Sequence, residues 1–134
     1  MDQNLKNGIA AQGYDVVSFF DGNPKKGNAT IASNYNDGQF QFSSEANKTK
    51  FENTPEAFAP QYGGYCAIAM SEGAKANPNP KSWEVRDGKL YFFTRMLFGI
   101  IDAKRQWVKD PLAKRDLADA AWEALQKEEG VSNN

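Results

Sequence analysis

Two Asp-Gly pairs constrain the fold of this 134-residue chain more than any other feature. Each pair, at residues 37–38 and 87–88, separates two short segments in which apolar and polar residues alternate. Asp-Gly readily adopts the positive φ angles of a tight turn, and alternation is typical of half-buried strands. We therefore expect antiparallel β-hairpins over residues 29–43 and 83–93.

Helix signals alternate with the two hairpins. Ser43 or Ser44 can cap a helix over residues 44–53, and Pro55 suits the first turn of a short second helix. A further helix is expected from about residue 65 to 72, and a glycine follows it at a position that suits a helix C-terminus.

Three other segments complete the prediction. The run YDVVSFF at residues 14–20 is β-branched and aromatic and predicts a strand. Residues 96–110 and 111–130 predict two helices, because apolar side chains recur in them at helical spacing. The side chains that define these patterns are Leu97, Ile100, Ile101 and Val108 in the first helix and Leu117, Ala121, Ala124 and Leu125 in the second.

The sum of these elements predicts an α+β fold. Short antiparallel hairpins pack with helices, and the last two helices form a C-terminal arm. We expect a flexible N-terminus over residues 1–12 and one domain over residues 13–130, because the length suits a single hydrophobic core. Trp122 is expected to pack on that core, since it lies beside the apolar stripe of the last helix.

Composition excludes several classes of function. Sixteen basic and seventeen acidic residues leave a net charge of -1, and no basic cluster provides the face that a nucleic-acid binder needs. No apolar run approaches the roughly 20 residues of a membrane-spanning helix. The first residues lack the features of a signal peptide. We expect a periplasmic or secreted protein whose leader has been removed, with a cytoplasmic location as the alternative.

The chain has one cysteine, Cys66, and no histidine. A tetrahedral Cys/His zinc site needs about four such ligands, so it is excluded. Cys66 lies at the expected start of a helix, where unpaired N–H groups favour a thiolate, and Met70 follows at i+4. A thiolate and a thioether suit Cu(I), so copper is the candidate cofactor. The alternative is that both residues simply pack in the core.

A second candidate site combines Tyr14 and Asp15 with Tyr62 and Tyr65, which we expect around the same helix start. A buried carboxylate near phenolic hydroxyls can bind a small polar ligand or a cation. The alternative is a structural role in which Asp15 accepts hydrogen bonds from the backbone of a turn.

Enzymatic activity is not expected. The chain has no histidine base, no Gly-x-Ser-x-Gly elbow and no phosphate-binding glycine loop. Thiol redox chemistry at Cys66 is the remaining catalytic idea, and it would need an external partner because no second cysteine is present.

Several of these motifs together resemble small bacterial YHS domain-containing proteins. GYD at residues 13–15, PQYGGYCA at 60–67, DGKLYF at 87–92 and QWVKDP at 106–111 carry the resemblance. It extends from about Gly13 to Trp122 and implies a core related to metal-binding TRASH domains, found in copper-transporting ATPases and other metal-handling proteins.

The resemblance implies two alternative functions. In metal-binding relatives, cysteines occupy positions that fall here near Ser18, Ser43 and Asn47, so the chain has lost those sulfur atoms. The first expectation is a non-enzymatic accessory protein that handles copper or another soft metal through Cys66. The second is a scaffold or small-ligand-binding module that keeps the YHS fold without its metal site.

The apolar segment Met96 to Ile101 is longer than the resemblance predicts. It is a candidate surface for self-association or for a protein partner. The alternative is that it fills the core between the second hairpin and the C-terminal arm.

Overall fold

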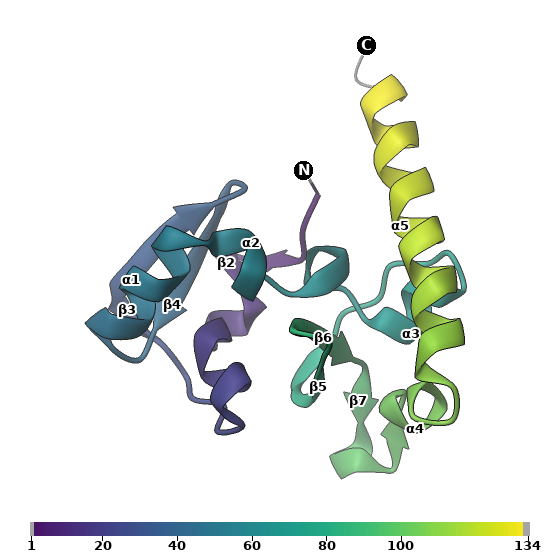
Figure 1. Ribbon diagram of the computed structural model, residues 1–134, viewed down its shortest axis with the longest axis horizontal. Coiled ribbons are helices and arrows are strands. Elements are labelled where there is room, and N and C mark those ends of the chain that lie inside the picture. Colours follow the sequence, from purple (N-terminus) through teal and green to yellow (C-terminus); the bar gives the residue numbers. More distant parts are fainter. Residues whose placement is uncertain (1, 133–134) are drawn as a thin grey trace.

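The computed structural model describes residues 2–132. A four-stranded sheet with the helices α1 (Glu45–Asn53) and α2 (Pro55–Phe58) forms one side of the molecule, and a two-stranded sheet with the long helix α5 (Pro111–Ser132) forms the other (Figure 1). Small antiparallel sheets and several helices therefore confirm the α+β class.

The four-stranded sheet has the order β1-β2-β4-β3. Its first hairpin pairs β3 (Asn28–Tyr35) with β4 (Gly38–Phe42), as predicted. The short strand β2 (Ile9–Ala10) runs parallel to β4, and β1 (Leu5–Lys6) closes the edge. The side chains of Phe40 and Phe42 are both buried, which agrees with the predicted face of the hairpin.

The turn of this hairpin differs from the predicted one by one residue. Asn36 and Asp37 have the positive φ angles, 51° and 66°, whereas Gly38 is the first residue of β4. A side chain at Gly38 would lie 2.6 Å from atoms of Gln3 and Leu5. Glycine is therefore needed for the close approach of the N-terminal segment rather than for the turn.

Residues 2–12 pair and pack with the domain instead of lying apart from it as a flexible N-terminus. Ile9 of β2 pairs with Gln39, and Ala10 is buried in the core. The side-chain amide of Gln3 donates hydrogen bonds to the carbonyl oxygens of Tyr35 and Asn36 at 2.9 and 2.6 Å. A polar side chain of this segment thus satisfies two carbonyl groups of the hairpin turn.

The predicted strand at residues 14–20 is wrong. After the short 3-10 turn η1 (Ala11–Gly13), the segment forms the 3-10 helix η2 (Val16–Asp21). Asp15 caps this helix by accepting hydrogen bonds from the N–H groups of Val17 and Ser18. The cap and the burial of the first four residues of η2 outweigh the strand propensity of the β-branched side chains.

The predicted helices of the middle segment are confirmed, with shifted ends. Ser44 caps α1, since its hydroxyl accepts a hydrogen bond from the N–H group of Asn47 at 3.1 Å. After α2, the turn η3 (Gln61–Gly64) leads into α3 (Ala67–Ser71), which is shorter than predicted.

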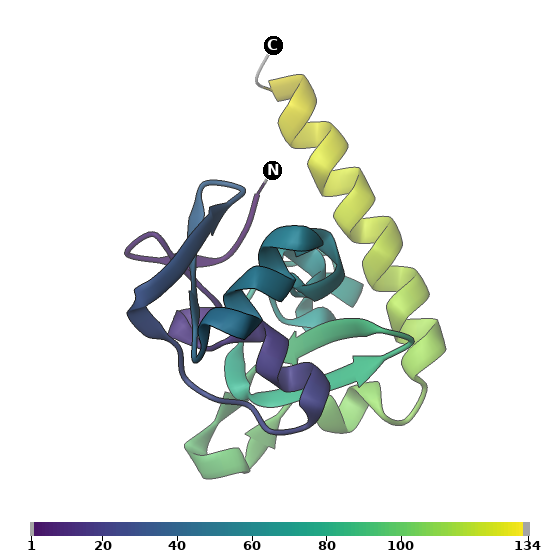
Figure 2. The same cartoon turned by 60° about the vertical axis from the view of Figure 1, so that its left-hand side comes forward.

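The second hairpin pairs β5 (Asn79–Arg86) with β6 (Lys89–Phe93) through a turn at Asp87 and Gly88, as predicted. Strand β6 is buried on both faces. Its residues Leu90 and Phe92 belong to one hydrophobic cluster, whereas Tyr91 and Phe93 belong to the other. Strand β6 therefore divides the interior (Figure 2).

The cluster on the Phe92 side is called the sheet cluster, and that on the Phe93 side the helix cluster. The sheet cluster contains the buried side chains of η2, β4 and α1, including Phe19, Phe40 and Phe51. In the helix cluster, α3 packs with Trp107, which is 0% exposed, and with one face of α5.

The predicted helix at residues 96–110 is largely wrong. The segment forms a small hairpin, with β7 (Arg95–Met96), the turn η4 (Leu97–Gly99) and β8 (Ile101–Asp102). Only α4 (Lys104–Trp107) is helical. The predicted helical spacing gives no buried stripe here, because most of its apolar residues are exposed.

The last helix is confirmed, although its buried stripe lies one residue away from the predicted one. Ala118 is fully buried, and Ala121, Trp122 and Leu125 pack on the helix cluster, whereas Leu117 and Ala124 are exposed. Trp122 thus packs on the core as predicted. Within residues 2–132, no helix combines the length and the apolarity needed to cross a bilayer.

We predict that Gly63→Ala destabilises the protein more than Gly73→Ala. Both glycines have positive φ angles, 60° and 79°, for which a side chain costs roughly 1–2 kcal/mol. A Cβ atom at Gly63 would also lie 2.6 Å from the carbonyl oxygen of Asp2, whereas the space around Gly73 is empty. Urea unfolding should show a loss at Gly63 that exceeds the loss at Gly73 by at least about 1 kcal/mol. Equal losses would contradict the close approach of the N-terminal segment.

Candidate functional site

Cys66 is the residue that immediately precedes α3 and is 1% exposed. Its N–H group donates to the carbonyl oxygen of Ala76 at 3.0 Å, and its backbone forms an isolated bridge with Phe92. The side chain belongs to the helix cluster. The thiol is therefore part of the core, as in the alternative in which Cys66 simply packs.

Met70 lies one turn after Cys66 and is fully buried in the same cluster. The structure thus places the two predicted soft ligands on the same side of α3, as the i+4 spacing implied. Both are surrounded by apolar and aromatic side chains. Among residues 2–132, no group of three or more Cys, His, Asp or Glu side chains is placed to hold a metal ion.

The Gly-Gly pair before Cys66 has a backbone role. Three consecutive residues, Tyr62, Gly63 and Gly64, have φ angles of 58°, 60° and 85°. The carbonyl group of Gly63 accepts a hydrogen bond from the N–H group of Asn4 at 2.7 Å. Glycines at these positions permit a left-handed turn against which the N-terminal segment packs.

Asp15 is fully buried and accepts five hydrogen bonds through its carboxylate. One oxygen accepts from the N–H groups of Val17 and Ser18 at 2.9 and 3.3 Å. The other accepts from the N–H group and the hydroxyl of Ser43 at 2.9 and 2.7 Å, and from the amide of Asn47 at 2.9 Å. Asp15 therefore accepts backbone hydrogen bonds in a turn, which is the structural role given as the alternative. It also connects this turn to α1 through Asn47.

The donors around Asp15 include Ser18, Ser43 and Asn47, the positions at which the resemblance places cysteines in metal-binding relatives. The Ser18 hydroxyl also donates to the backbone carbonyl of Asp15 at 2.6 Å and accepts from the N–H group of Lys25 at 2.9 Å. A hydrogen-bonded carboxylate thus lies among the positions near which the resemblance places the cysteines of metal-binding relatives. We call these four side chains the Asp15 network.

The structure does not bring the second candidate constellation together. Tyr14 packs on the sheet cluster beside Phe19, with the ammonium group of Lys26 5.8 Å from its ring centroid. Tyr62 and Tyr65 belong to or pack on the helix cluster. The prediction of one site around the start of α3 is wrong, because β6 and its two clusters separate the pairs.

Tyr62 joins the turn η3 to α5. Its hydroxyl donates a hydrogen bond of 2.7 Å to the carboxylate of Asp119. Burial, followed by this hydrogen bond and the negative charge of Asp119, raises the pKa of Tyr62 above its ordinary value. Tyr62 is therefore a neutral donor, and its hydroxyl is already occupied.

Near Tyr65, three charged side chains meet. Lys75 forms ion pairs with Asp2 and Glu129, and its ammonium group lies 5.7 Å from the Tyr65 ring centroid. Hydrogen bonds to the carboxylates of Asp2 and Glu129 raise the pKa of Lys75. The contacts fasten the N-terminal segment to α5, which is a structural role.

A pocket of about 220 Å³ lies beside Tyr62. Its wall comes from the N-terminal segment, the first hairpin turn, α2, η3 and α5. We call it the Tyr62 pocket. Its aromatic and acidic lining residues are Tyr35, Tyr62, Trp122, Asp2 and Glu56.

The aromatic rings and carboxylates of the Tyr62 pocket both favour a cation. The carboxylate of Asp2 is already paired with Lys75, whereas Glu56 is exposed. Of the four predicted ligand-binding residues, only Tyr62 lines this pocket. Its other members come from segments far apart in the sequence, and no motif links them.

Comparison of the chain with protein-family models, with curated proteins and with solved structures gives no match. The resemblance to YHS proteins therefore remains a prediction from the motifs of the chain.

We predict that Asp15→Asn strongly destabilises the protein. The substitution replaces one oxygen that accepts hydrogen bonds by an NH₂ group that faces donors, so buried donors lose their partners. Losses of this kind cost about 3 kcal/mol. Asp21→Asn is the matched control, since Asp21 is exposed at the other end of η2. Urea unfolding should separate the two variants, and comparable losses would contradict the role of the Asp15 network.

Proposed function

We propose that this protein is a non-enzymatic binding module that works without a metal ion and takes a small cationic ligand in the Tyr62 pocket. The observation that carries the proposal is the lining of the pocket, in which three aromatic rings stand with two carboxylates. The proposal corresponds to the scaffold or small-ligand alternative that the sequence leaves open.

The size of the pocket limits the ligand. Pockets for drug-sized molecules have volumes of about 300–1,000 Å³. At about 220 Å³, the Tyr62 pocket suits a ligand of only a few heavy atoms. A cation over an aromatic face gains electrostatic attraction, and the exposed carboxylate of Glu56 adds to it. Small amines and quaternary ammonium groups fit this chemistry.

The surroundings of Cys66 favour packing over metal handling. Its side chain is 1% exposed, and Met70 is 0% exposed. A copper ion carried between partners must reach its ligands from the surface, whereas these two lie in the helix cluster. The Asp15 network supports the same reading, because its donors and acceptors satisfy one another without an ion.

Choline is a suitable probe for the Tyr62 pocket, and its neutral isostere 3,3-dimethyl-1-butanol is the matched control ligand. We expect choline to shift the indole N–H signal of Trp122 in NMR spectra and to bind about tenfold more tightly than the isostere. Glu56→Gln should weaken choline binding, whereas Glu72→Gln should not, since Glu72 is an exposed carboxylate outside the pocket. Equal binding of the two ligands, or no shift of Trp122, would refute the cationic ligand.

The metal-handling alternative is tested at Cys66. We expect slow alkylation by iodoacetamide at neutral pH, at a rate set by local opening, and no protection by Cu(I). Cys66→Ala should cost about 1 kcal/mol of stability and leave choline binding unchanged. Fast alkylation that Cu(I) blocks would support copper handling instead.

A further inference from the structure

The strongest unexplained feature of the surface is the small hairpin of β7, η4 and β8. We call residues 96–101 the apolar tip. Eight large hydrophobic side chains are exposed in the described part of the chain, and five of them belong to this tip. The exposed fractions are 51% for Met96, 61% for Leu97, 101% for Phe98, 74% for Ile100 and 46% for Ile101.

The backbone of the apolar tip has an unusual conformation. Leu97 and Phe98 have positive φ angles of 53° and 55°, and Gly99 follows at 94°. Bulky residues rarely adopt this conformation, so the backbone of the turn is strained. The turn presents Phe98 to solvent rather than burying it.

One arginine is hydrogen-bonded to the strained turn, and a second lies beside it. The guanidinium group of Arg105 donates hydrogen bonds to the carbonyl oxygens of Ile100 and Gly99 at 2.7 and 2.6 Å. The guanidinium of Arg95 lies over Gly99, where a Cβ atom would be 2.9 Å from its Nη2 atom. Arg105 therefore holds the apolar tip in shape, and two guanidinium groups lie next to its turn.

The charge behind the tip differs in sign from that of the rest of the chain. Residues 95–109 contain four basic side chains and one acidic one, Asp102. The remaining residues contain twelve basic and sixteen acidic side chains. The carboxylate of Asp102 accepts a hydrogen bond from the Ser82 hydroxyl at 2.5 Å. It also lies 3.9 Å from the Nε atom of Arg95. The basic residues are Arg95, Lys104, Arg105 and Lys109.

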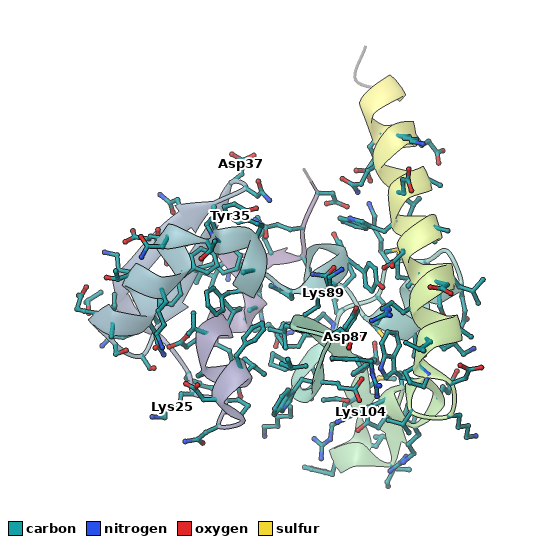
Figure 3. The ribbon with its side chains drawn as sticks, in the orientation of Figure 1. Lys25, Tyr35, Asp37, Asp87, Lys89 and Lys104 are labelled. Carbon is teal, nitrogen blue, oxygen red and sulfur yellow. The ribbon has the colours of Figure 1, made fainter. Side chains whose placement is uncertain are left out.

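We propose that the apolar tip docks the protein on an anionic lipid surface. Its apolar side chains would enter the boundary between headgroups and acyl chains, and the basic residues behind them would face the anionic headgroups. The proposal is independent of the Tyr62 pocket. Tyr35 of that pocket lies in the upper left part of Figure 3, whereas Lys104, three residues after the tip, lies in its lower right part.

The charge pattern favours a lipid surface over a second copy of the chain. Two copies that met tip to tip would bring two net positive segments together, and like charges across an interface oppose association. An anionic bilayer supplies both an apolar layer and the complementary charge. It also needs no pocket shaped to receive Phe98, because lipid chains adapt to a protruding side chain.

The test is co-sedimentation of the full chain with vesicles. We expect binding to vesicles of phosphatidylcholine that contain phosphatidylglycerol, and at least tenfold weaker binding to phosphatidylcholine alone. Phe98→Asp should lower binding to the anionic vesicles at least tenfold. Leu117→Asp is the control and should bind like the wild type, since Leu117 is an exposed apolar residue, at 54%, outside the tip. Circular dichroism should show both variants folded, because neither residue is buried.

Three outcomes would overturn the proposal. They are no binding of the folded protein to anionic vesicles, equal binding to neutral vesicles, and equal effects of Phe98→Asp and Leu117→Asp. A concentration-dependent dimer in light scattering that Phe98→Asp abolishes, without vesicle binding, would assign the tip to self-association instead. Arg105→Lys tests whether the shape of the tip matters. The variant keeps the positive charge but loses one of the two hydrogen bonds to the turn. We expect a several-fold loss of vesicle binding if the shape of the tip is required.

Discussion

Strand β6 is the constraint on which the rest of the structure depends, because it is buried on both faces. Leu90 and Phe92 point into the sheet cluster, and Tyr91 and Phe93 point into the helix cluster. Such a strand has a nearly continuous run of apolar residues, and it is stable only where other elements cover both of its faces. The first sheet with η2 covers one face, and α3 with α4 and α5 covers the other. The two sides of the molecule thus require each other.

Polar groups organise the two sides in different ways. On the sheet side, the carboxylate of Asp15 connects η2 with Ser43 and α1. On the helix side, Glu84 accepts a hydrogen bond from the indole of Trp107 at 2.5 Å and pairs with Arg86. Although burial opposes ionisation, these hydrogen bonds lower the pKa of Glu84. In both places, a buried or half-buried acid is retained because donors from separate elements converge on it.

Local signals predicted the elements that depend on local chemistry. Both hairpins, the Ser44 cap and the C-terminal helix follow from turn residues, capping and periodicity. The predictions for 14–20 and 96–110 failed because specific contacts that periodicity does not reveal decided these segments. These are burial and the Asp15 cap in the first, and the hydrogen bonds of Arg105 to the turn in the second. For the candidate sites, the acceptor role of Asp15 was predictable from a single residue type. The Tyr62 pocket was not, since its wall comes from five separate segments.

The interior and the surface of this protein differ in how well their side chains are satisfied. The groups with reactive potential in the interior, Cys66, Asp15 and Tyr62, are buried, hydrogen-bonded or both. At the apolar tip the reverse holds, since Leu97 and Phe98 each adopt a conformation that costs about 1 kcal/mol and expose apolar surface. The guanidinium group of Arg105 holds that shape through two hydrogen bonds to the carbonyl oxygens of the turn. A strained and exposed apolar turn that specific hydrogen bonds hold in shape is the observation on which the proposed docking surface rests.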